Sequence, residues 1–298
     1  MYYIYTNEYI VMERIRTMNT TTNANVIYVS LDTTEGTACV GHWIWECALF
    51  LPYIKDIQNK TSTPLKILLN GKKRYKTNML SDFGFCEDDI VYSTKMAKDG
   101  NTWQEYYVIP EEDEYMLYTP KFFYLWTVFL HTTDFFEAFE RFRNFYLSKL
   151  EPITKTTPIV YLSRSRLENY IPGGIHPFVN FNDFYNMIEK RGIDILNIDT
   201  LSSFVPQFQK VLDSKTIIVE MGSAFTINAA FIASNSHIIV INDTYGYNTC
   251  KYSFFHVLRK LVSLRNNTIE IFSTSPGGGP FNIDIPKFER FIDKIRPR

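Results

Sequence analysis

The chain has 298 residues, of which 45% are hydrophobic and 21% charged, with a formal net charge of -1. This length corresponds to about two domains, and the composition excludes a disordered or fibrous protein. The near-neutral charge gives no indication of a strongly basic face, so nucleic acid is not an expected partner. Aromatic residues make up 16% of the chain. Tyrosine-rich clefts suit carbohydrate rings, although aromatic residues more often build the core.

The cysteines and the apolar segments indicate a cytoplasmic protein. Four cysteines occur without a C-x-x-C pair and are predicted to be free thiols in a reducing compartment. The first residues contain no apolar run followed by a small-residue cleavage site. The most apolar stretch, Lys121–Leu130, is too short to span a bilayer, so no transmembrane segment is expected.

In the first half of the chain, β-branched and aromatic runs alternate with helical patterns. The expected strands are the hairpin-like Tyr2–Tyr5 and Tyr9–Arg14, followed by Val26–Leu31, Pro64–Leu69 and Asp89–Ser93. The expected helices are His42–Gln58, Thr77–Phe83 and Thr133–Leu150. This alternation is typical of an α/β sheet. The Pro/Thr-rich segment Glu151–Pro158 is the expected interdomain linker.

The second half shows the same alternation more clearly. Its expected strands are Ile159–Ser163, Ile193–Asn197, Thr216–Glu220 and His237–Ile241. Its expected helices are Asn182–Arg191, Phe204–Asp213, a helix from the Met221–Ala224 turn through Ala233, and Pro286–Ile295. Gly192 is well placed to end the first of these helices.

Together the two halves predict an α/β fold with two Rossmann-like domains, residues 1–150 and 151–298, and a C-terminal helix. Two such domains facing a central cleft form the GT-B architecture. A single larger α/β domain is the alternative.

The most informative segment is TIIVEMGSAFTINAAF, where a buried strand runs into Gly222, Ser223 and Ala224 and a helix follows directly. Small residues at such a turn let the backbone approach a ligand, and free N–H groups at a helix start favour an anion. The diphosphate of a nucleotide sugar is such an anion. Tight packing of the helix on the sheet is an equally good explanation. The pattern is not G-x-G-x-x-G, so it gives little support to a nicotinamide site.

A second segment, SRSR, lies at the carboxyl end of the strand Ile159–Ser163. Ligands of open α/β sheets collect at the carboxyl ends of the strands. Arg164 and Arg166 are therefore candidates for neutralising the diphosphate of a departing nucleotide. The alternative is a pair of surface arginines in ordinary ion pairs.

A third segment, GHWIWE, opens the helix expected after the first buried strand. His42 and Glu46 are four residues apart and share one helix face, where a carboxylate can orient an imidazole and raise its basicity. Such a pair suits a general base, although a lone histidine is more often structural. Asp32 and Glu35, in the loop before the helix, are rival bases.

The same part of the chain is expected to contact the acceptor, through Asp32, Gly36, Gly41 and Trp43. The acidic run Glu111–Glu114 is expected to be a solvated loop, and the remaining histidines have no ligand spacing. No metal site and no cofactor are therefore expected.

In this order, the three segments resemble glycosyltransferase family 61. The amino-half motif of that family, N-Y-x-H-W-x-x-E-x-x-P, is similar to GHWIWECALFLP, with His42, Trp43, Glu46 and Pro52. The carboxyl half of the family is similar to Tyr161–Arg164, Asn182–Asp183, Gln207 and Gly222–Thr226 of this chain. Two positions depart from the family: Met221 stands where the family has histidine, and Ile227 intervenes between Thr226 and Asn228.

The resemblance implies a metal-independent, inverting glycosyltransferase, with the acceptor, an oligosaccharide or glycan, in the amino half and a UDP-sugar donor in the carboxyl half. The leading donor is UDP-xylose, in surface-polysaccharide or viral glycoprotein glycan synthesis. The residues expected to bind the nucleotide sugar are Arg164, Arg166, Asn182, Gln207, Glu220, Met221, Gly222, Ser223, Ala224, Phe225 and Thr226. The alternatives are a non-catalytic carbohydrate- or nucleotide-binding module and a Rossmann-type oxidoreductase or epimerase.

Overall fold

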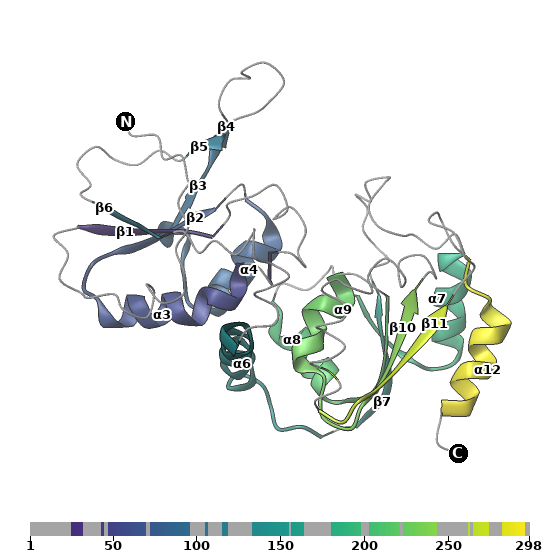
Figure 1. Cartoon of the computed structure of the whole chain (residues 1–298). Coiled ribbons are helices and arrows are strands. Elements are labelled where there is room, and N and C mark those ends of the chain that lie inside the picture. Colours follow the sequence, from purple (N-terminus) through teal and green to yellow (C-terminus); the bar gives the residue numbers. More distant parts are fainter. Residues whose placement is uncertain are drawn as a thin grey trace. The chain divides into compact units, whose positions relative to one another are not determined.

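A computed structural model describes residues 25–31, 43–44, 47–69, 72–95, 105–106, 115–118, 133–154, 156–163, 180–197, 203–220, 223–242, 262, 265–273 and 282–295. The chain divides into two compact units, Met1–Phe145 and Tyr146–Arg298 (Figure 1). Each unit contains its own parallel sheet. The α/β class expected from the sequence is therefore confirmed, and the sheets are compatible with a Rossmann-like fold.

Unit 1 is built on a four-stranded sheet. Its strands are β1 (Val26–Ser30), β2 (Leu65–Leu69), β3 (Ile90–Tyr92) and β6 (Tyr115–Tyr118), in the order β3-β2-β1-β6. Every neighbouring pair is parallel. The central strands β1 and β2 are almost completely buried, which explains why they read as continuous apolar runs rather than as alternating ones. A short antiparallel pair, β4 (Thr94–Lys95) and β5 (Glu105–Tyr106), follows β3.

The helix expected over His42–Gln58 is not continuous. Trp43 and Ile44 are helical, Cys47 lies in a turn, and a short 3-10 helix, η2 (Ala48–Phe50), precedes α3 (Leu51–Lys60). Pro52 explains the interruption, because it has no N–H to donate and its ring would clash with the carbonyl four residues earlier in a continuous helix. Proline is instead accommodated in the first turn of α3.

The remaining helices of unit 1 are α4 (Arg74–Asp82), the 3-10 turn η3 (Glu87–Asp89) and α6 (Thr133–Leu147). The helix α4 begins three residues before the expected Thr77. Within unit 1, α6 lies against α3: Arg141 pairs with Asp56 at 3.1 Å and sits over the ring of Tyr53. Phe142 of α6 stacks on Phe83, which follows α4.

Unit 2 contains a five-stranded parallel sheet in the order β11-β10-β9-β7-β8. The strands are β7 (Thr157–Ser163), β8 (Asp194–Asn197), β9 (Ser214–Glu220), β10 (His237–Asn242) and β11 (Thr268–Ser273). The segment expected to be a linker is hydrogen-bonded to the helix α8 (Val205–Leu212) and to the residue after it, because the Glu151 and Thr154 amides donate to Gln209 and Asp213.

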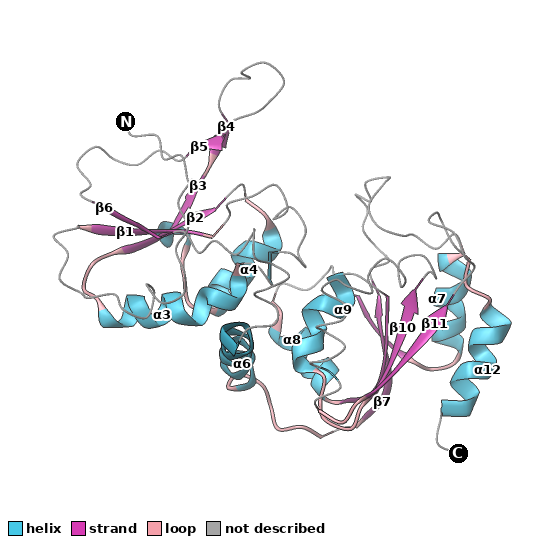
Figure 2. Cartoon of the chain, viewed as in Figure 1, coloured by secondary structure: helices cyan, strands magenta, loops and turns pink. Residues whose placement is uncertain are grey.

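Helices cover both faces of this sheet (Figure 2). On one face lie α7 (Phe181–Lys190) and α12 (Ile285–Ile295), whose Phe184 and Phe288 pack with Tyr161 and Phe272 of the sheet. On the other lie α8 (Val205–Leu212), α9 (Ser223–Asn228) and the 3-10 turn η6 (Ala229–Phe231). Aromatic stacking joins this second layer, with the rings of Phe208 and Phe231 3.6 Å apart.

The expected elements of the second half are all present, with ends shifted by a few residues. Four of the described strands were not expected from the sequence: the short pair β4 and β5, and also β6 and β11. The expected hairpin strands Tyr2–Tyr5 and Tyr9–Arg14 lie outside the described residues. Within the described part of the chain, no helix is both long and apolar enough to cross a membrane.

Gly192 ends α7 in a Schellman motif, in which its N–H donates to the Glu189 carbonyl and the Ile193 N–H donates to the Ile188 carbonyl. Its φ of +60° lies in the left-handed region. A Cβ here would meet no atom within 4 Å, so only the backbone conformation opposes substitution.

Gly192→Ala should therefore lower the free energy of unfolding by about 1–2 kcal/mol, measured by urea unfolding. Gly192→Asn should lower it less, because asparagine tolerates this conformation; equal stability of wild type and Gly192→Ala would contradict the prediction.

Candidate functional site

The order of strands in unit 2 creates a single point where the chain changes direction across the sheet. From β7 the chain first adds β8 on one side, and then adds β9, β10 and β11 in succession on the other. The helix after β7 covers one face and the helix after β9 covers the opposite face. The carboxyl ends of β7 and β9 therefore lie where the strand order reverses, which is the usual ligand position of an open parallel sheet.

The residues that the sequence singled out follow these two neighbouring strands. Leu162 of β7 pairs with Val219 of β9, so the strand ends Ser163 and Glu220 lie at the same edge of the sheet. Arg164 and Arg166 come directly after β7, while Met221 and Gly222 come directly after β9, and these four lie outside the described residues. The pairing thus brings together the strand ends Ser163 and Glu220, which are nearly sixty residues apart in sequence.

A buried polar contact joins the two strands at this edge. The hydroxyl of Tyr161 on β7 donates a 2.7 Å hydrogen bond to Oε1 of Glu220 on β9. Tyr161 is completely buried, Ser163 beside it is also buried, and Glu220 is partly exposed. Burial raises the pKa of Tyr161 well above its usual value, and the neighbouring Glu220 carboxylate raises it further. The hydroxyl therefore remains protonated and acts as the donor.

Gln207, an expected ligand residue, belongs to a second polar contact inside unit 2. It is 2% exposed, and its Nε2 donates to Oδ1 of Asn228 at 2.9 Å. Because Gln207 lies on α8 and Asn228 ends α9, this amide pair joins the two helices beneath the sheet edge. Its geometry is that of a structural contact that supports α9, rather than of a group that faces a ligand.

The other expected donor residues have different surroundings. Asn182 is exposed in the first turn of α7. Phe225 of α9 is 1% exposed and belongs to the core. The helix α9 begins at Ser223, two residues earlier than expected, and it ends at Asn228, where the 3-10 turn η6 follows. The side chains of Ser223, Ala224 and Thr226 lie outside the described residues.

One residue near this edge was not identified from the sequence. Asn180, immediately before α7, forms two hydrogen bonds with the backbone of Ile283, donating to its carbonyl at 2.8 Å and accepting from its N–H at 2.9 Å. This contact fixes the segment before α12 against the start of α7. Asparagine residues at helix starts usually cap their own helix, so the sequence carried no signal for this long-range role.

In unit 1, the corresponding reversal of the strand order falls between β1 and β6. Of the residues expected there, His42, Glu46, Asp32, Gly36 and Gly41 lie outside the described residues.

Trp43 is fully buried and packs edge-on against Tyr75 of α4, with ring centroids 6.0 Å apart. The Cys47 N–H donates to the Trp43 carbonyl at 2.9 Å. One α-type turn therefore spans these residues, and Trp43 anchors it to the core.

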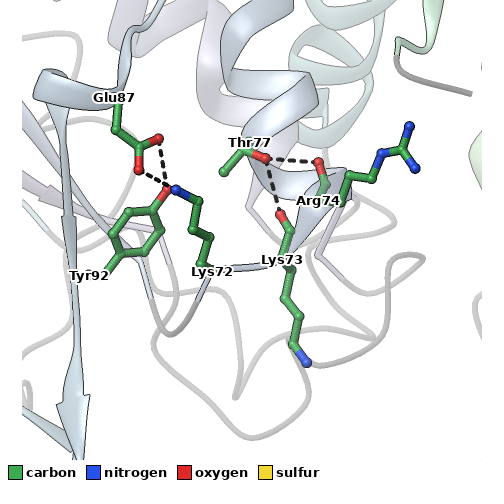
Figure 3. A network of polar contacts seen from close by, with 6 residues as sticks. All are labelled: Lys72, Lys73, Arg74, Thr77, Glu87 and Tyr92. Carbon is green, nitrogen blue, oxygen red and sulfur yellow. Dashed lines mark hydrogen bonds and ion pairs between the residues drawn. The ribbon is translucent and has the colours of Figure 1, made fainter. Parts of the chain in front are cut away.

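A further polar network lies where β2 leads into α4 (Figure 3). Lys72 pairs with Glu87 at 2.6 Å, and the Tyr92 hydroxyl donates to the same carboxylate at 3.3 Å. The hydrogen bond from Lys72 lowers the pKa of Glu87, and the same contact raises the pKa of Lys72. These groups are well exposed, so the pair contributes little to stability. The side chains of Lys73 and Arg74 extend away from the network.

Among the described residues, no group of three or more His, Cys, Asp or Glu side chains is arranged to hold a metal ion. Comparison with models of protein families found no match, and comparison with curated proteins found no similar sequence.

The Gln207–Asn228 pair gives a direct test of whether Gln207 is structural. Gln207→Leu removes the buried donor to Oδ1 of Asn228, so it should lower the free energy of unfolding by about 1–3 kcal/mol. The double variant Gln207→Leu/Asn228→Leu should recover part of this loss, because both polar groups are then removed. Urea unfolding measures both effects. A Gln207→Leu variant with wild-type stability would show that the amide pair is not a structural contact.

Proposed function

We propose that this chain is a glycosyltransferase that uses a nucleotide-sugar donor, with the donor held at the carboxyl ends of β7 and β9. The observation that carries the proposal is the pairing of these two strands at the point where the sheet changes direction. In the sequence, the SRSR segment begins at the end of β7 and the EMGSA segment begins at the end of β9. Strand ends at such a point are where open parallel sheets usually bind their ligands. The resemblance of these segments to glycosyltransferase family 61 supports the same assignment.

In this proposal, the donor diphosphate is neutralised by protein groups rather than by a metal ion. Arg164 and Arg166 supply positive charge from the end of β7, and the small residues Gly222–Ala224 let the diphosphate approach the first N–H groups of α9. Glu220 carries negative charge and would repel the diphosphate. Its carboxylate is therefore assigned to the hydroxyl groups of the donor, for which it is an acceptor.

The acceptor glycan is assigned to unit 1, and the two units would face each other as in the GT-B architecture. His42, oriented by Glu46, removes the proton from an acceptor hydroxyl, whose oxygen then attacks the anomeric carbon of the donor sugar. The bond from that carbon to the diphosphate breaks, and its electron pair leaves with UDP, inverting the anomeric centre. Asp32, Gly36 and Gly41 lie in the same loop and would contact the acceptor. Trp43, being buried, holds the turn that carries the base.

The donor class is tested by calorimetry with the full chain. UDP should bind, and it should bind equally well in excess EDTA, because arginine and backbone N–H groups neutralise the diphosphate. UDP-xylose is the first donor to test for hydrolysis and transfer. Binding of NAD without UDP would favour an oxidoreductase or epimerase, and binding of free sugar without nucleotide would favour a lectin-like module; either result would overturn the proposal.

Arg164 should act mainly on the chemical step. Negative charge on the departing UDP grows as the glycosidic bond breaks, so Arg164→Ala should lower kcat by about 10²–10³-fold. The control is Arg290→Ala, which removes an exposed arginine of α12 and should leave kcat unchanged. Steady-state kinetics measure kcat and KM separately. A change confined to KM would assign Arg164 to ground-state binding alone.

A further inference from the structure

The contact between Tyr161 and Glu220 has a geometry that goes beyond filling the core. Tyr161 pairs with Ile218, two residues before Glu220, so the two side chains lie diagonally on the same face of neighbouring strands. The phenol ring extends along the sheet toward its carboxyl edge, and its hydroxyl meets the carboxylate at 2.7 Å. A ring packed edge-on by Phe184 of α7, with centroids 5.4 Å apart, cannot move its hydroxyl far.

The carboxylate gains orientation from this contact. Glu220 is partly exposed at the end of β9. A free glutamate side chain samples many rotamers, and holding it in one of them costs about 1.5–2 kcal/mol in conformational entropy. A hydrogen bond from an immobile, buried hydroxyl selects one rotamer before any ligand arrives. Such orientation in advance is what a binding site requires of its polar groups.

We propose that Tyr161 is a positioning residue, which orients the Glu220 carboxylate to accept hydrogen bonds from hydroxyl groups of the nucleotide sugar. The inference rests on the proposed function and deepens it, because it assigns the edge of β9 to the neutral, hydroxyl-bearing part of the donor. These hydroxyls belong either to the ribose or to the transferred sugar. Both present the same chemistry to a carboxylate.

The experiment compares variants of the full chain by calorimetry with UDP and with UDP-xylose. Tyr161→Phe removes only the hydroxyl and should weaken binding about 3–10-fold, because Glu220 must then lose more of its conformational entropy when the ligand binds. Glu220→Ala should weaken binding about 10–100-fold. In the Glu220→Ala background, Tyr161→Phe should cause no further loss, because its effect passes through Glu220. A purely structural tyrosine would change stability without this dependence.

Two further variants keep the test decisive. Tyr146→Phe removes a hydroxyl from another buried tyrosine, which packs on Phe208 and Phe231; it should leave affinity for UDP unchanged. Glu220→Asp keeps the negative charge, but its shorter side chain moves the carboxylate away from the Tyr161 hydroxyl. It should therefore weaken binding as much as Tyr161→Phe does, and it provides a second test in case Tyr161→Phe folds poorly.

The ligands distinguish the source of the hydroxyls and separate the two proposals. Weaker binding of UDP itself assigns Glu220 to the ribose, and weaker binding of UDP-xylose alone assigns it to the transferred sugar. If the wild type binds UDP and both Tyr161→Phe and Glu220→Asp bind both ligands as the wild type does, the inference is wrong while the proposed function stands. If the wild type binds neither ligand, both proposals are wrong.

Discussion

The parallel pairing of β7 with β9 is the constraint on which the rest of unit 2 depends. Because β8 lies on the opposite side of β7, the chain must cross to the other face before it can form β9. This crossing places α7 and α12 on one face and α8 and α9 on the other. It also places the ends of β7 and β9 side by side. The position of the candidate site is thus a consequence of topology.

Two hydrogen-bonded pairs lie near the carboxyl edge of the unit 2 sheet, and they differ in how far their residues are exposed to solvent. Both residues of the Gln207–Asn228 pair are buried, and the hydrogen bond between their amides joins α8 to α9. The Tyr161–Glu220 pair is buried at one end only. A contact with one buried donor and one partly exposed acceptor fixes the direction of a charged group at the end of a strand. In the proposal above, this asymmetry distinguishes a contact that orients a ligand-binding carboxylate from one that only joins two helices.

The elements that the sequence predicts well are those whose local pattern agrees with their tertiary surroundings. The apolar runs of β7, β9 and β10 are buried on both faces, and Gly192 ends α7 because no other residue adopts its conformation as easily. By contrast, β11 was not expected, although its segment TIEIFS alternates polar and apolar residues as a half-buried edge strand does, so the sequence did carry a signal for it. The break near Pro52 could have been read from the sequence, since proline there disfavours a continuous helix.

The candidate site is less predictable because residue type and position do not determine burial. Gln207 and Glu220 were both expected to face a nucleotide sugar, and both are polar residues near the same sheet edge. Only the packing of α8 shows that the first points into the protein, toward a partner twenty-one residues away in sequence. Tyr161 illustrates the opposite case: an aromatic residue inside a buried strand indicates core, yet its hydroxyl lies at the site. For aromatic residues with a polar tip, the ring and the hydroxyl must therefore be assigned separately.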